Sequence, residues 1–146
     1  GLMLHDPEEE HDCFSDNTHN SHYYNVVGIN NVFLGKYKSL DGKVVSGPSI
    51  SSLLSEVDNG LNKKTKKSIK NTLKSMKKIV KSANKGVTYD MLIAEGNEKG
   101  NKLIQNAVDS LIKQSKNIEL AAAALNINDL QIEGSDSLDN PDAVFN

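Results

Sequence analysis

The segment LNKKTKKSIKNTLKSMKKIVKSAN, residues 61–84, has the clearest helical periodicity in this chain. Lysines occupy much of it, with ten of them from position 63 to position 85 and no acidic residue among them. Lys85 and Gly86 then form a helix C-terminus signal. The apolar residues recur at the i, i+4, i+7 and i+11 positions of one helical face: Ile69, Leu73, Met76 and Val80. The pattern predicts a long amphipathic helix that packs through one face.

The lysine-rich surface of this helix has two interpretations. Long lysine side chains often cover apolar neighbours while their ammonium groups stay in water, which favours a solvated face. The alternative is a docking surface for an anionic partner. The chain contains seventeen Lys and no Arg, so it lacks the planar guanidinium that specific recognition of bases and phosphates uses. We therefore expect no nucleic-acid partner.

Further helices are predicted on both sides of this segment. A long helix is expected over residues 98–125, and a first long helix from Glu8 or Ser15 to Lys38. Two short helices are expected at 50–57 and 89–95. The first long helix has apolar residues on more than one side, which predicts a central helix packed on several neighbours.

Together these elements predict an all-α protein, an antiparallel helical bundle of three long and two short helices. There is no convincing strand pattern, although residues 43–45 are compatible with a brief extended piece. The 146 residues fit one domain, 1–146, with its own core. Residues 126–146 are acidic and rich in Asp, Ser and Asn, and we expect a mostly irregular tail. Because three long helices cover only part of so apolar a central helix, we also expect a second layer from a missing segment or another subunit.

Composition excludes several classes of protein. No stretch reaches the roughly 18 apolar residues that a membrane span requires, and residues 1–4 are followed by acidic residues rather than by the apolar core of a signal peptide. Cys13 is the only cysteine, so no internal disulfide can form. The first residue is not Met, from which we expect a processed product or a piece of a longer protein.

Ionisable groups are densest near the N-terminus. All four histidines lie within the first 22 residues, together with six of the nineteen acidic residues. If this stretch is helical, one face carries Glu8, His11, Asp12, Ser15, Asp16, His19, His22 and Tyr23. Buried ionisable groups need a partner or a metal, which favours a site, whereas the alternative is a solvated acidic helix start. If Ser15 or Asp16 is instead the N-cap, residues 8–14 form a loop and the argument from a single face weakens.

Carboxylate and imidazole groups on one face suit zinc or iron, and Glu8-x-x-His11 has the spacing that helical bundles use for metal ligands. One helix cannot surround an ion, and no histidine follows His22. The remaining ligands must come from another segment or from later acidic residues, namely Asp90, Glu95, Glu98, Asp109, Glu119 and the tail. The chain has no His-Glu-x-x-His motif, no phosphate-binding glycine loop and no cysteine pair for zinc.

Residues 9–19, EEHDCFSDNTH, resemble the E-H-S-C-F-S-D-N-T-H signature of the imelysin family, with Asp12 where that pattern usually has Ser. The resemblance continues through residues 24–37 and returns at 46–49 and 103–125. It implies an all-α fold with two bundle-like halves and a cleft between them, in a bacterial cell-envelope protein linked to iron uptake and classed with metallopeptidases. The family's other signature, Gly-x-His-x-x-Glu, belongs to the first half and does not occur here. We therefore expect this chain to be the C-terminal half, with the missing N-terminal half as its partner.

The resemblance also assigns site residues at the matching positions. The implied metal ligands are His11, Asp16 and His19, and the expected cofactor is a divalent metal, zinc or iron. Glu10 and Asp16 are the implied catalytic carboxylates. The remaining polar residues of the cleft are Ser15, Asn17 and Thr18.

Three functional hypotheses stay open at this stage. The first is a metallopeptidase in which the metal activates water and a carboxylate carries the proton. The second is a non-catalytic periplasmic protein that binds a metal or another ligand for iron uptake. The third is a structural bundle whose polar motif holds the two halves together. The expected partners are a peptide or an iron-related ligand. The expected location is the bacterial periplasm or the outer-membrane surface, with membrane attachment only through an anchor outside this chain.

Overall fold

The computed structural model describes residue 7 and residues 10–127. Its elements in chain order are α1 (Thr18–Leu34), β1 (Lys36–Lys38), β2 (Val44–Ser46), α2 (Ile50–Val57), α3 (Asn59–Ala83), α4 (Tyr89–Ile93) and α5 (Glu98–Ala124). Apart from one short hairpin, the regular secondary structure of the described residues is therefore helical, which confirms the predicted all-α class. None of the described helices is long and apolar enough to cross a membrane. The predicted irregular tail falls almost entirely on residues 128–146, outside the described part.

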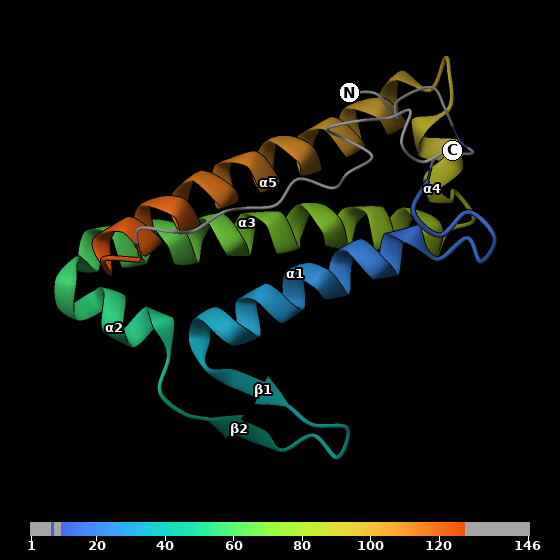
Figure 1. The fold of residues 1–146 in the computed structure, drawn as a ribbon. Coiled ribbons are helices and arrows are strands. Elements are labelled where there is room, and N and C mark those ends of the chain that lie inside the picture. The colour runs from blue at the N-terminus through green and yellow to red at the C-terminus, as the bar shows by residue number, and fades with distance from the viewer. Residues whose placement is uncertain (1–6, 8–9, 128–146) are drawn as a thin grey trace, which may run out of the picture.

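Helix α3 is the central element of the bundle (Figure 1). It packs against α1, α2 and α5, while α4 packs on α5 at the other end of the molecule from α2. Among the described helices, α3 and not the first long helix is therefore central, and the second layer expected over the first helix stays a prediction. Two apolar residues of α1 stay uncovered in the described chain, since Tyr24 is 64% exposed and Val32 is 68% exposed.

The first helix is shorter at both ends than its apolar pattern predicts. It begins at Thr18, after the N-cap Asn17, and not at Glu8 or Ser15. It ends at Leu34 because Gly35 adopts a left-handed conformation, with φ of 58°, that only glycine adopts freely. Residues 36–38, expected to be helical, instead form β1, and Tyr37 pairs with Val45 of the antiparallel strand β2.

The other helices begin close to their predicted residues because polar side chains cap them. Ser49 and Ser52 form a reciprocal capping box at the start of α2. The Asp58 carboxylate accepts a hydrogen bond from the Leu61 N–H at 2.8 Å, so α3 starts at Asn59 directly after α2.

The core consists of two apolar clusters with polar contacts between α3 and α5. One cluster lies toward α4 and the other toward α2. Between them along α3, the Thr72 hydroxyl donates to the Ser110 carbonyl at 3.1 Å. The buried members of the first cluster are Val26, Met76, Ile79, Tyr89, Leu92, Ile93, Ile104 and Ala107, and those of the second are Phe33, Leu54, Ile69 and Ala121.

Candidate functional site

The N-terminal segment from Glu10 to Asp16 is a series of turns and not part of a helix. Two contacts tie it to the first turns of α1. The Asp12 N–H donates to the Thr18 hydroxyl at 2.9 Å, and the Ser21 hydroxyl donates to the Asp12 carboxylate. Thr18 itself is fully buried. The turn is therefore held against α1 by side chains that the helix presents.

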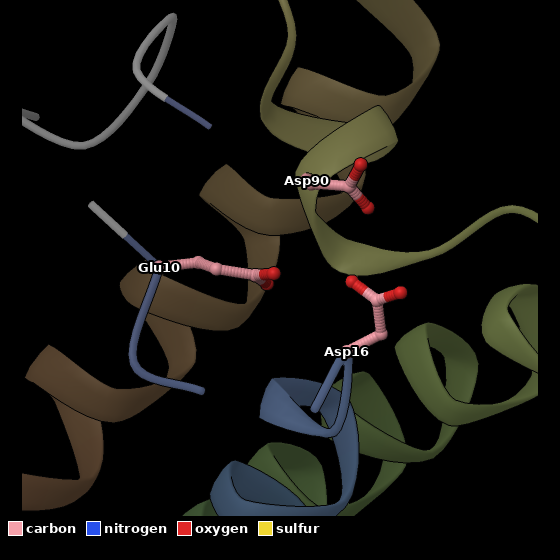
Figure 2. Close-up of side chains that lie close together, drawn as sticks. All are labelled: Glu10, Asp16 and Asp90. Atoms are coloured by element: carbon pink, nitrogen blue, oxygen red, sulfur yellow. The ribbon is translucent and has the colours of Figure 1, made fainter. Parts of the chain in front are cut away.

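Asp16 lies in a backbone conformation that few residues adopt. Its φ is 49°, in the left-handed region, where a residue other than glycine is uncommon and Asp and Asn are the usual exceptions. Such conformations are concentrated at functional sites. The bend places Asp16 directly before the N-cap of α1, so that the carboxylate faces the short helix α4 (Figure 2).

Helix α4 brings a third carboxylate, Asp90, to the same place. The Thr88 hydroxyl donates to the Asp90 carboxylate at the start of this helix. The Asn101 amide of α5 donates to the carbonyls of Leu92 and Ala94, both at 3.0 Å, which secures the end of α4. The position of Asp90 therefore depends on the packing of α4 against α5.

Glu10, Asp16 and Asp90 converge (Figure 2). One carboxylate oxygen from each residue lies within 4.8 Å of those from the other two. Glu10 is only 5% exposed, Asp90 is half-buried and Asp16 is exposed. The Oε2 atom of Glu10 is buried and has no hydrogen-bond partner among the described residues. Leaving a buried acceptor unpaired lowers the free energy of unfolding. A cation or a hydrogen-bond donor at this oxygen would remove that cost.

The electrostatics of the cluster oppose negative charge on Glu10. Burial raises the pKa of Glu10, the Thr18 hydroxyl partly offsets that shift, and the carboxylates of Asp90, Asp16 and Asp12 add to it. Within the described residues the only ion pair joins Lys43 to Asp41, so no described lysine neutralises the three carboxylates. At an effective dielectric constant near 20, two unit charges at about 5 Å repel by about 3 kcal/mol. A cation would relieve this repulsion.

Among the described residues, His11, His19 and His22 lie outside this cluster. The His11 ring lies 5.7 Å from the His22 ring, which lies 5.5 Å from the Tyr89 ring, centroid to centroid. Burial and the nearby His11 lower the pKa of His22, against a smaller raising effect of Asp12. His19 has a buried Nδ1 atom with no partner in the described chain, while its Nε2 atom lies 3.2 Å from the Asn20 amide.

The structure groups the predicted site residues differently from the sequence analysis. The implied metal set was His11, Asp16 and His19, but neither histidine belongs to a group of three possible ligands in the described part of the chain. Asp16 instead meets Glu10, the other implied catalytic carboxylate, and Asp90. The physical reason is that residues 10–16 form turns, so the single helical face that aligned the histidines with Asp16 does not exist.

The remaining predicted residues have local structural roles. Ser15 and Asn17 are exposed. The Asn17 side chain accepts a hydrogen bond from the Asn20 amide at 2.9 Å, and Ser15 bonds back to the Asp12 carbonyl. Thr18 is the residue of this set that adjoins the cluster, because its hydroxyl interacts with Glu10 as well as with Asp12.

Asp90 does not stand out in the sequence. It appeared only as one of several later acidic residues, because nothing in the local pattern connects it to Glu10 or Asp16. The one local signal was Thr88 followed by Asp90, a cap and a first-turn acid of a short helix. That signal locates a helix start and says nothing about which distant segment the carboxylate will face.

A comparison with protein-family models matches the family described as imelysin over residues 1–118. The chain belongs to the imelysin family. A search of the curated proteins finds no match to it. The region matched by the imelysin model includes all three clustered carboxylates, the turn that carries two of them and the helix that carries the third.

Proposed function

We propose that this imelysin-family chain binds a cation through Glu10, Asp16 and Asp90. The observation that carries the proposal is the meeting of three carboxylates within 4.8 Å, one of which has a buried oxygen without a partner. The left-handed backbone at Asp16 and the Asn101 contacts to α4 support it, because both serve to place ligands from distant segments. Cation binding also explains why three carboxylates lie together, whereas a structural hydrogen-bond network would not need three negative charges.

The chemistry of these donors favours a cation that prefers oxygen ligands. Carboxylates suit manganese, magnesium and calcium, whereas imidazole and thiolate are the usual ligands of structural zinc. Helical bundles hold iron through ligand sets that are mostly carboxylate. Of the two metals implied by the resemblance, iron is therefore the better fit. Three ligands leave positions open for water or for groups from another polypeptide.

The proposal is tested by measuring cation binding to the whole chain by calorimetry and metal analysis. The cations are manganese, calcium, zinc and anaerobic ferrous iron. We expect E10Q, D16N and D90N each to weaken binding by about tenfold or more, which corresponds to about 1.4 kcal/mol per lost ligand. The matched control is E119Q, which removes one carboxylate from an exposed position of α5. Equal affinity in all four variants, or no binding by the wild type, would refute the site.

Two further variants test the ligand set implied by the resemblance. H11A and H19A leave the three carboxylates in place, so we expect them to retain most of the affinity for manganese and ferrous iron. If both variants instead lose binding as completely as D16N does, the histidines are ligands and the carboxylate set is wrong.

The cell-envelope location, the role in iron uptake and the peptidase activity rest on the family resemblance and stay proposals. We favour cation binding over catalysis because the cluster supplies ligands and the chain lacks the usual metallopeptidase motif. A proteolysis assay with and without chelator separates the two. Cleavage that chelation and E10Q both abolish would favour the peptidase.

The proposed N-terminal partner half has a candidate contact surface on α1 and the hairpin. Val32, Tyr37 and Val45 are each more than half exposed, and together they line one groove. An exposed apolar groove of this kind marks an interaction site. We expect V32K to weaken association with the separately expressed N-terminal half in a binding assay, while L40K, at an exposed position outside the groove, does not.

A further inference from the structure

A second polar feature lies between α3 and α5, and no residue of α1 or of the carboxylate cluster lines it. Two adjoining hollows, of about 480 Å³ and about 300 Å³, run between α3 and α5. They share Ser68, Asn71 and Lys113, so they form one continuous groove. We call this feature the α3–α5 groove.

Lysines surround the α3–α5 groove. Those lining it are Lys64, Lys67, Lys74, Lys78 and Lys113. None forms an ion pair with a carboxylate of a described residue, since the one such pair lies in the hairpin. Asp109 is the single acidic residue in the lining. The groove therefore concentrates positive charge that the described chain does not neutralise, and such a concave surface focuses attraction for anions.

The neutral residues of the groove indicate which anion it suits. Asn71, Asn106 and Asn117 line it, together with serine hydroxyls. An asparagine amide offers both a donor and an acceptor, which matches the N–H and C=O of a peptide bond. A polyphosphate presents almost only acceptors and would leave the asparagine oxygens unmatched. The lysines supply charge without the planar fork of arginine that specific phosphate recognition uses.

We propose that the α3–α5 groove binds an extended acidic polypeptide segment of a partner protein. Its lysines attract the acidic side chains, and its asparagines bond the peptide backbone. A membrane surface fits less well, because phospholipid headgroups lack the paired N–H and C=O of a peptide bond that the asparagines match. Asp109 disfavours a partner that carries negative charge at every position. It tolerates a peptide whose residue next to Asp109 is neutral or basic.

The test measures fluorescence anisotropy of a labelled twelve-residue peptide of alternating Glu and Ser with the full chain. We expect micromolar or weaker binding at low salt that falls as salt is raised, because the contacts are exposed. The triple variant K67Q/K74Q/K113Q should weaken binding by about tenfold, as the loss of three exposed charge contacts implies. Circular dichroism confirms that each variant stays folded.

The matched control is K66Q/K70Q/K77Q, which removes the same charge from exposed positions of α3 that do not line the groove. We expect it to weaken binding by no more than about twofold to threefold. An equal loss in both triple variants would show diffuse attraction to the whole helix and overturn the proposal. So would an absence of binding by the wild type.

Two single variants and two other probes test the assigned chemistry. D109N should strengthen peptide binding, because it removes the one negative charge in the lining. N71A should weaken binding of the peptide more than binding of polyphosphate of equal charge. Tighter groove-dependent binding of polyphosphate or of vesicles containing anionic phospholipid than of the peptide would overturn the assignment of the partner.

Discussion

The Thr18 hydroxyl accepts a hydrogen bond from the Asp12 N–H at 2.9 Å, and this contact joins the buried start of α1 to the turn that bears the site. The same hydroxyl also favours the charged form of Glu10. The Thr18 side chain therefore holds the turn against the helix and also partly offsets the rise in the pKa of Glu10. The contribution of this hydroxyl can be measured by removing it.

Replacing Thr18 by Val keeps the shape of the side chain and removes the hydroxyl. The Asp12 N–H then loses its acceptor, and we expect a loss of about 1–2 kcal/mol in the free energy of unfolding, as for other buried groups left unpaired. Urea denaturation measures this loss. T18S, which retains the hydroxyl, is the control for the hydrogen bond. A T18V protein as stable as the wild type would show that the contact does not hold the turn.

Glu10 should make stability depend on pH in the absence of a cation. Its raised pKa means that the folded chain holds this proton more tightly than the unfolded chain does. The associated stability is fully present below the ordinary pKa of 4.5 and is lost as the pH rises through the raised value. In the presence of chelator, E10Q should therefore gain stability relative to the wild type as the pH rises above 4.5.

At pH 7, added manganese should make the wild type more stable than E10Q. The cation compensates the buried charge in the wild type and thereby stabilises the folded state, whereas E10Q lacks the ligand. Thermal unfolding with and without manganese provides the measurement. If the metal raises the melting temperature of both proteins equally, Glu10 does not contact it.

His22 should contribute a second, opposite pH dependence. Burial lowers its pKa below the ordinary value of 6.5, so the folded chain disfavours the protonated ring. Its stability contribution is present above pH 6.5 and is lost as the pH falls through the lowered value. We expect H22Q to lose less stability than the wild type between pH 7 and pH 5, measured by urea denaturation at each pH. H11Q should reduce the effect in part, because His11 is the second cause of the shift.

Gly35 and Gly42 form a matched pair for measuring the cost of a side chain. Both have positive φ, 58° and 84°. A Cβ atom at Gly35 would lie 2.6 Å from the Pro48 carbonyl oxygen, whereas one at Gly42 would have nothing within 4 Å. G42A should cost about 1 kcal/mol for its backbone conformation, and G35A about 2–4 kcal/mol, because crowding adds to that cost. Equal losses in the free energy of unfolding, measured by chemical denaturation, would mean that the backbone at Pro48 moves away from the added methyl group at no cost.

Several elements could be predicted from the sequence because local forces determine them. The apolar rhythm of α3 and the stop at Lys85-Gly86 each depend on residues within a few positions of one another. The motif at residues 9–19 likewise indicated the family and drew attention to Glu10 and Asp16. Even so, Gly35 ended α1 where its apolar residues alone predicted continuation, because a local left-handed conformation outweighs helical periodicity.

The sequence by itself determined that the chain forms amphipathic helices, roughly where most of them start and stop, and where its ionisable groups are concentrated. Only the tertiary structure decided that α3 is the central helix, that Asp90 rather than a histidine joins Glu10 and Asp16, and that lysines of α3 border a groove with α5. The physical reason is that periodicity and capping are set by neighbours along the chain. The meeting of Asp90 with Asp16 depends instead on α4 packing on α5 and α1 packing on α3, contacts between segments far apart in sequence.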